Sequence, residues 1–222
     1  MVINENNKMS NYFTKVFLWM FIGLFVSGVV AYFTSHNYTM LSIVSKGYFF
    51  IIILELVCVI AFSKLVTKVS SGTSKLLFIG YSILNGLTLS TVFLVHRLGS
   101  ITTAFFTASL MFGLLAAYGY ITKNDLTSFG KILFIGLFTV IIVSIINIFV
   151  GNGTVNIVLS ILSVLIFCGL TAYDMQKLKR LYNYYGEEKA DSIAIYGALD
   201  LYLDFINIFI HLLSLFGGRR RN

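Results

Sequence analysis

The C-terminal stretch from Ile193 to Phe216 is apolar and long enough to cross a membrane, yet it carries polar and ionisable side chains. At about 100° per residue on a helix, these side chains fall within an arc of roughly 80°. They are Tyr196, Asp200, Asp204, Asn207, His211 and Ser214. This polar stripe is roughly 27 Å long against a hydrocarbon core of about 30 Å, so it nearly crosses a bilayer.

Lipid cannot solvate the two carboxylates of this stripe. An Asp at the centre of a membrane helix costs about 3 kcal/mol even on the lenient insertion scale, so the polar stripe is expected to face protein or water. A buried path that conducts or senses an ion is therefore the first hypothesis. Asp200, Asn207 and His211 are candidate residues of that path.

The composition of the chain is that of a polytopic membrane protein. Hydrophobic residues make up 58% of the 222 positions, charged residues make up 11%, and the mean hydropathy is +0.89. Soluble domains average about 25% charged residues. The net charge of +7 comes from Lys and Arg that lie between apolar runs, so membrane orientation explains it better than nucleic-acid binding does. No nucleic-acid partner is expected.

Seven apolar runs, each close to the 17 to 25 residues that a spanning helix needs, predict an all-α bundle of seven transmembrane helices. The runs are Val16 to Phe33, Ile43 to Phe62, Leu76 to Val95, Ile101 to Tyr120, Ile132 to Val150, Val155 to Tyr173 and Ile193 to Phe216. They predict one transmembrane domain over residues 16–216, an N-terminal tail over 1–15 and a basic C-terminal tail over 217–222. The longest connection, Asp174 to Ser192, is expected to be a loop.

Lys and Arg are concentrated in the N-terminal tail and in the loops after the second, fourth and sixth runs. By the positive-inside rule, the N-terminus and those loops are cytoplasmic. Arg219, Arg220 and Arg221 disagree with a simple seventh crossing. The alternative is a last segment that enters the membrane and returns on the same side.

Acidic residues inside the runs are the strongest candidates for proton binding. They are Glu55, Asp200 and Asp204, with Asp174 expected at the end of the sixth helix. Two carboxylates that meet cannot both ionise readily, so they tend to share a proton. Asp204 can form such a pair with Asp200, one turn away, or with Asp174 from the neighbouring helix. A plainer alternative makes Asp174 a solvated helix-end residue beside Lys177.

Glu55 stands alone on its run and needs a partner from another helix. The candidates are Asn85, Ser82, Asn147 and His211, and either a structural hydrogen bond or a role in the ion path fits. Small hydroxyl residues of the runs are expected to serve helix packing: Thr88, Ser90, Thr91, Ser109 and Ser144.

The sequence offers little for a tightly bound metal or for catalysis. His36, His96 and His211 are the three histidines, and oxygen ligands suit Ca²⁺ or a proton better than a transition metal. Cys58 and Cys168 lie in apolar runs and are expected to pack. HExxH, GxSxG, P-loop and GxGxxG motifs are all absent, so neither an enzyme nor a cofactor is expected.

Three segments closely resemble signature regions of the Bax inhibitor-1 family, also called the transmembrane BAX inhibitor motif family, and above all its bacterial YccA- and YetJ-like members. The segments are GALDLYLDFINIF (Gly197 to Phe209), TAYDMQKLK (Thr171 to Lys179) and KNDLTSFGKILFIGL (Lys123 to Leu137). The resemblance implies a seven-helix bundle with the last helix at its centre. It also implies a pH-sensitive calcium leak channel.

The resemblance assigns the proton-sharing pair to Asp174 and Asp204, where Ca²⁺ would bind transiently. Family members usually have a small polar residue where this chain has Asp200, so this protein carries an additional acid beside the pair. A basic latch near the cytoplasmic end of the second helix corresponds to Lys64 or Lys68, and Glu55 matches an acid of bacterial relatives. Lysine would make a weaker latch than the forked guanidinium of arginine.

Three functions remain open from the sequence. The leading hypothesis is a calcium leak channel gated by the protonation of Asp174 and Asp204 in a bacterial inner membrane, with the N-terminus cytoplasmic. The second, implied by YccA-like members, is a membrane interaction protein that modulates a membrane-bound protease or the translocation machinery. The third is a proton-coupled cation antiporter.

Overall fold

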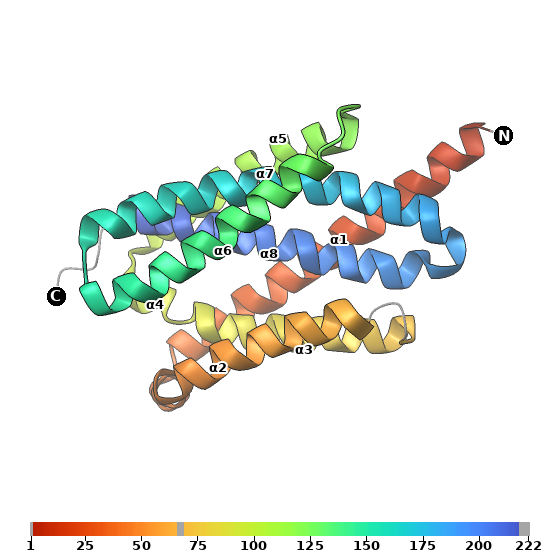
Figure 1. Cartoon of the computed structure of the whole chain (residues 1–222). Coiled ribbons are helices and arrows are strands. Elements are labelled where there is room, and N and C mark those ends of the chain that lie inside the picture. The colour runs from red at the N-terminus through yellow and green to blue at the C-terminus, as the bar shows by residue number, and fades with distance from the viewer. Residues whose placement is uncertain (1, 66–68, 218–222) are drawn as a thin grey trace. The chain divides into compact units, whose positions relative to one another are not determined.

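The computed structural model describes residues 2–65 and 69–217, and within those ranges the chain forms helices and no strand. The long helices are α1 (Val2–Ser35), α2 (Tyr38–Leu65), α3 (Ser71–Leu89), α5 (Leu98–Ile121), α6 (Thr127–Val150), α7 (Gly153–Tyr185) and α8 (Ala190–Phe216) (Figure 1). Two short pieces, α4 (Val92–Val95) and the 3-10 turn η1 (Glu187–Lys189), lie between them.

Seven helical stretches are long and apolar enough to cross a membrane, and each predicted run lies inside one of them. The prediction of an all-α fold with seven transmembrane helices is therefore confirmed. The third run is interrupted between α3 and α4, where the hydroxyls of Ser90 and Thr91 donate to the carbonyls of Leu87 (2.6 Å) and Thr88 (2.8 Å). Such side-chain bonds offer the backbone an alternative to the helical ladder.

The chain has no proline, and its helix boundaries are formed by glycines and by a polar cap. Gly151 (φ 71°) ends α6 and Gly186 (φ 68°) follows α7, both in the left-handed region that favours glycine. Ser70 caps α3 because its hydroxyl accepts a hydrogen bond from the backbone N–H of Thr73 (3.2 Å). The helix boundaries thus follow local chemistry.

The expected loop from Asp174 to Ser192 is wrong, because α7 continues to Tyr185 and the connection to α8 is reduced to a few residues around η1. The reason is a continued helical pattern. Met175, Leu178 and Tyr182 are all buried at spacings of three and four residues, and no helix-breaking residue occurs before Gly186. Asp174 consequently lies within a helix rather than at its end.

The chain divides into two compact units that both draw on α7 and α8. The first comprises Met1–Val95 and Arg180–Tyr202, and the second comprises His96–Lys179 and Leu203–Asn222. Of the seven spans, the one that contains α8 is the most enclosed. In its apolar stretch 72% of the residues are buried, against 6% for α2. High burial of the last helix is what its expected central position requires.

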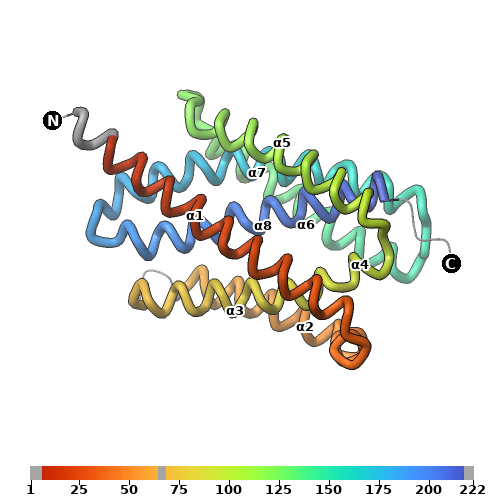
Figure 2. The backbone as a smooth tube through the Cα atoms, turned by 180° about the vertical axis from the view of Figure 1, so that it is seen from behind, coloured from red at the N-terminus to blue at the C-terminus, as the bar shows by residue number. Residues whose placement is uncertain are grey.

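In the first unit, α1, α2 and α3 pack against one another, and α2 and α3 run alongside each other in both views (Figures 1 and 2). Glycine allows the closest approach of α1 and α3. A Cβ atom on Gly86 would overlap Val30 and the carbonyl of Ser27. Close packing at small residues is the usual way for membrane helices to associate.

The N-terminal residues up to Lys15, expected as a tail, are helical from Val2 onward and continue directly into the first span. The ring of Tyr12 stacks on Tyr182 (centroids 4.8 Å apart), and Lys8 pairs with Glu187 (2.9 Å). Lys15 pairs with Asp191 in the first turn of α8 (2.5 Å). The first turns of α1 therefore dock on the α7–α8 connection.

Replacing Tyr12 by Ala is expected to lower the free energy of unfolding by about 3 kcal/mol, because the side chain is only 2% exposed and its ring stack is lost. Thermal denaturation in detergent measures the change. Tyr38→Ala is the matched control, since Tyr38 is 87% exposed and should tolerate truncation. Equal stability of the two variants would contradict this docking.

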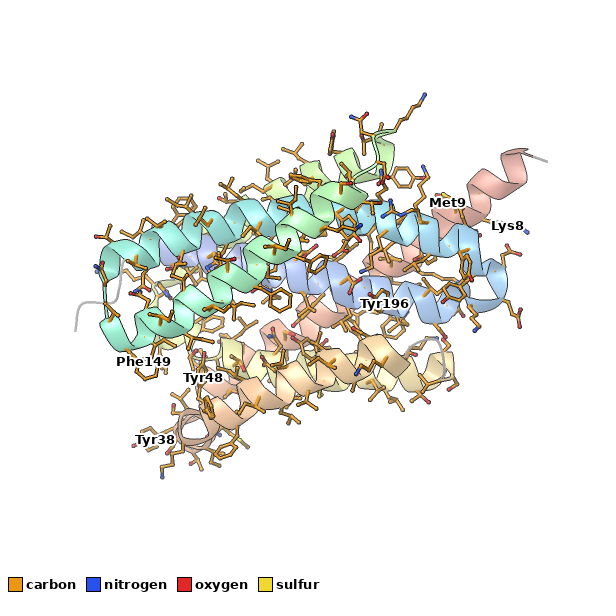
Figure 3. The ribbon with its side chains drawn as sticks, viewed as in Figure 1. Lys8, Met9, Tyr38, Tyr48, Phe149 and Tyr196 are labelled. Atoms are coloured by element: carbon orange, nitrogen blue, oxygen red, sulfur yellow. The ribbon has the colours of Figure 1, made fainter. Side chains whose placement is uncertain are left out.

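The outer surface of the helices is strongly apolar. Tyr38 near the start of α2 and Phe149 near the end of α6 project outward (Figure 3), and both are more than four-fifths exposed. Aromatic residues near helix ends are typical of membrane–water interfaces. Because the chain is an integral membrane protein, lipid covers this surface.

Candidate proton-sensing site

Asp174 and Asp204 are both buried, at 6% and 4% exposure, and both belong to the second unit. Asp174 lies on α7 and Asp204 on α8. The alternative in which Asp174 is a solvated helix-end residue is therefore wrong. Its carboxylate is enclosed because α7 carries on for eleven residues beyond it, to Tyr185.

Two contacts join the antiparallel helices α7 and α8. The rings of Phe167 and His211 lie 6.4 Å apart at an interplanar angle of 20°, and the hydroxyl of Ser160 donates to Ser214 (3.2 Å). As the residue number rises on α7, it falls on α8.

Asp174 follows Phe167 by seven residues, and Asp204 precedes His211 by seven residues. Seven residues make nearly two helical turns, so each aspartate lies on the same side of its helix as the contacting ring. Each aspartate therefore lies on the face of its helix that contacts the other helix at Phe167 and His211.

Lys177 is the basic residue that contacts the candidate pair. Its ammonium lies 3.3 Å from Asp174 Oδ1, with the two side chains 23% and 8% exposed. The sequence presented Lys177 only as a neighbour of a solvated Asp174, although its spacing of three residues was the available signal. Of the proposed latch residues, Lys64 is exposed in the last turn of α2 and Lys68 lies outside the described residues.

The polar stripe of α8 is less uniform than its sequence pattern indicates. Asp204 is its one buried member, while Asp200, Asn207 and His211 are half-buried. The amide of Asn207 donates to the carbonyl of Leu203 on its own helix (2.8 Å). Asp200 belongs to the first unit, one turn before Asp204. The half-buried groups precede and follow Asp204 along α8.

Glu55 finds its partners on α3. The hydroxyl of Thr88 donates to Glu55 Oε1 (2.7 Å), and the side chain of Asn85 lies beside Glu55. Asn85 was among the predicted partners, whereas Thr88, expected to serve helix packing, does so by a hydrogen bond that joins α3 to α2. Thr88 follows Asn85 by three residues and so shares its face of α3.

The other proposed partners of Glu55 form bonds elsewhere. Asn147 stabilises the α6–α7 turn, where its amide donates to Asn156 Oδ1 (2.7 Å) and its carbonyl oxygen accepts from the N–H of Asn152 (3.2 Å). The hydroxyl of Ser82 donates to the carbonyl of Phe78 (2.9 Å) within α3. These polar side chains satisfy nearby backbone groups, as buried polar atoms generally do.

Tyr202 is a buried polar residue that the sequence analysis missed. It is fully enclosed, and its hydroxyl contacts Ser27 Oγ (2.6 Å) and Asn85 Oδ1 (2.7 Å). It lies off the polar stripe of α8, so the helical pattern gave it no role. The available signal was chemical, because a buried tyrosine hydroxyl almost always needs a hydrogen-bond partner.

Comparison with known proteins shows the family of this chain. The model of the family described as inhibitor of apoptosis-promoting Bax1 matches residues 9–221. Inner membrane protein YbhL of Escherichia coli (strain K12) is 36% identical over 99% of this chain and 96% of its own length. A Borreliella burgdorferi protein is 40% identical over 96% and 94%, and a Streptococcus pyogenes serotype M1 membrane protein is 34% identical over 94% and 93%. The chain therefore belongs to the Bax inhibitor-1 family of integral membrane proteins.

Proposed function

We propose that the protein is a pH-sensitive cation leak channel, with Ca²⁺ as the transported ion, and that protonation of Asp174 and Asp204 gates it. The observation that carries the proposal is the burial of both carboxyl groups, each on the face of its helix that carries the Phe167–His211 contact. Ionisable residues buried among membrane helices mark ion pathways more often than they serve structure.

Protonation changes what the pair does to its two helices. When both carboxylates are ionised they repel each other and attract a cation, whereas a shared proton holds α7 and α8 together. A bias of a few kcal/mol between two arrangements is enough to open or close a path. Asp200, Asn207 and His211 continue the polar route along α8, and carboxylate and amide oxygens are the ligands Ca²⁺ prefers.

The location and topology belong to the same proposal. The name of the Escherichia coli relative supports a bacterial inner membrane. The clustering of Lys and Arg supports a cytoplasmic N-terminus. We propose no enzymatic step and no resident cofactor, so Ca²⁺ acts as cargo. Labelling of single cysteines at the two ends of the chain in intact cells measures the orientation.

Proteoliposomes loaded with a Ca²⁺-sensitive dye test the function directly. Wild-type protein is expected to pass Ca²⁺ down its gradient at a rate that changes about tenfold between pH 6 and 8, equivalent to about 1.4 kcal/mol of bias. A variant with both Asp174→Asn and Asp204→Asn should lose this dependence. A wild-type leak identical at all pH values, or a variant with unchanged pH dependence, would remove the gate.

Two controls separate this function from the alternatives. A proton-coupled antiporter would move Ca²⁺ only when a pH gradient is imposed, whereas a leak channel needs only the Ca²⁺ gradient. A protein that acts by binding a membrane protease or translocation component would keep its cellular role in the double variant. Either result would replace the channel with the other function.

Lys177→Gln is expected to move the pH-dependent transition of the leak to higher pH. The ammonium of Lys177 favours the ionised form of Asp174, 3.3 Å away, so its removal makes protonation easier. Because both side chains keep some solvent contact, the shift should stay below about one pH unit. Lys179→Gln, which removes a charge that lies over the Tyr120 ring instead, is the control. Equal midpoints for Lys177→Gln and wild type would contradict the contact.

A further inference from the structure

A chain of hydrogen bonds links four helices of the first unit and ends at Glu55. Ser27 Oγ on α1 contacts the hydroxyl of Tyr202 on α8 (2.6 Å), and that hydroxyl contacts Asn85 Oδ1 on α3 (2.7 Å). Asn85 in turn faces Glu55 on α2, and Glu55 accepts a hydrogen bond from Thr88 (2.7 Å), one turn along α3. We call Ser27, Tyr202 and Asn85 the relay. Its members are buried, at 6% exposure or less.

The relay can run in two directions, because each hydroxyl has one proton to donate. Ser27 Oγ also lies 2.7 Å from the carbonyl of Ser82 and 2.9 Å from the carbonyl of Gly23. If Ser27 donates to one of these carbonyls, Tyr202 must donate to Ser27. If Tyr202 donates to Asn85 instead, Ser27 must donate to Tyr202. The two directions exclude each other.

Each direction favours a different protonation state of Glu55. When Tyr202 donates to Asn85 Oδ1, the Asn85 amide nitrogen faces Glu55 and can donate to an ionised carboxylate. When Tyr202 donates to Ser27, its oxygen accepts from the Asn85 amide nitrogen, and Asn85 Oδ1 faces Glu55. Two acceptors would then meet unless Glu55 carries a proton and donates it.

We propose that Glu55 is a second protonation site, separate from the aspartate pair, and that the relay reverses its direction when Glu55 takes up a proton. The proton comes from solvent and stays on the Glu55 carboxyl group. The Asn85 amide turns over, and the Tyr202 and Ser27 hydroxyl protons rotate to their other acceptors. No covalent bond within the relay forms or breaks, so charge and atoms balance.

Glu55 is the titrating group of this cluster near neutral pH. The other titratable groups around it are Tyr81 on α3 and Tyr202 on α8, with Cys58, one turn along α2, beside Tyr81. Tyrosine and cysteine ordinarily lose their protons at about pH 10 and 8.5. The α1 helix contributes the Ser27 hydroxyl, which does not titrate. A change in the relay between pH 5 and 8 therefore reports on Glu55.

The relay reaches the helix that carries the proposed gate. Tyr202 precedes Asp204 by two residues on α8, and its ring packs edge-on against Phe78 (5.9 Å) and Tyr81 (6.0 Å) on α3. A bond to Ser27 draws the Tyr202 hydroxyl toward α1, while a bond to Asn85 draws it toward α3. Protonation of Glu55 on α2 is thereby communicated to α8.

Infrared difference spectroscopy of the purified protein during a pH titration measures the proposed proton directly. A carbonyl-stretch band of a protonated carboxylic acid should appear as the pH falls, and Glu55→Gln should remove that band while Asp174→Asn and Asp204→Asn leave it. No Ca²⁺ gradient is involved. Failure of the channel proposal would therefore leave this result intact, and loss of the band would not affect the channel proposal.

Ser27→Ala is expected to lower the pH midpoint of the Glu55 band by about one unit. Without Ser27 Oγ, the protonated arrangement leaves the Tyr202 hydroxyl as a buried donor with no acceptor, a loss equivalent to about one pH unit. In the ionised arrangement, the Tyr202 oxygen loses only the hydrogen bond that it accepted from Ser27. Leaving that lone pair without a donor costs less than leaving the Tyr202 hydroxyl without an acceptor. The variant should thus favour ionised Glu55 although Ser27 does not contact it.

Ser82→Ala is the matched control, since its hydroxyl is equally buried but donates to Phe78 within α3. It should leave the midpoint unchanged. In a Tyr202→Phe background, or in Asn85→Leu if that protein does not fold, Ser27→Ala should also have no effect, because the relay is already broken. The proposal is overturned if no band depends on Glu55, if Ser82→Ala shifts it equally, or if the Ser27→Ala shift survives in the broken relay.

Discussion

Asp174→Asn and Asp204→Asn are each expected to remove most of the pH dependence of the Ca²⁺ leak, and the double variant should add little to either. The two carboxyl groups are buried on α7 and α8, and in the proposed gate they share a proton and titrate as a pair rather than as independent acids. Asparagine resembles a permanently protonated aspartate. One substitution therefore ends the exchange between shared and separated states, and the effects of two substitutions should not add.

Asp200→Asn is the control for this experiment. Asp200 is half-buried and belongs to the first unit, one turn before Asp204. If it only borders the route, its removal should reduce the leak rate at every pH and leave the midpoint in place. Additive effects of the Asp174 and Asp204 substitutions, or an equal loss of pH dependence in Asp200→Asn, would show that the pair is assigned to the wrong residues.

Gly119→Ala is expected to destabilise the protein by about 3 kcal/mol through one added methyl group. A Cβ atom on Gly119, on α5, would overlap the backbone of Ala172 on α7. Backbone cannot rotate away as a flexible side chain can, so the two helices must separate, and overpacking of this kind costs about 1 to 3 kcal/mol or more. Thermal unfolding in detergent measures the effect.

Gly113→Ala provides the matched control on the same helix. Gly113 is exposed, and no atom lies within 4 Å of the position a Cβ would take. Alanine there should be neutral or stabilising by up to about 1 kcal/mol, because it favours the helix. If Gly119→Ala unfolds at the same temperature as Gly113→Ala, α5 and α7 do not approach as closely as described. Ala172 precedes Asp174 by two residues, so a displaced α7 should also alter the pH response.

The helices of this protein follow from its sequence because their cause is local. Runs such as Ile132 to Val150 are apolar at every turn and long enough to cross a bilayer, and only a helix satisfies their backbone groups there. The predicted ends of the helices were less accurate than their number. The extension of α7 past Asp174 depends on burial of Met175, Leu178 and Tyr182, which composition does not report.

The candidate site was only partly predictable for the same reason. A charged side chain inside an apolar run is visible in the sequence, so Asp204 and Glu55 were identified as residues that need protein or water around them. Their partners were not visible. Thr88 and Tyr202 have ordinary neighbours along the chain, and their roles arise from contacts with Glu55 and Ser27 on other helices.

The amino-acid sequence by itself determined the number of spans, the polar stripe of α8 and the acids that lipid would reject, since hydrophobicity and helical periodicity act over neighbouring residues. Only the tertiary structure decided which acid meets which partner. Register and rotation between helices depend on contacts a few atoms wide, such as Gly86 against Ser27 and Gly119 against Ala172. Steric fit at such points is a property of two surfaces together, and neither helix encodes it alone.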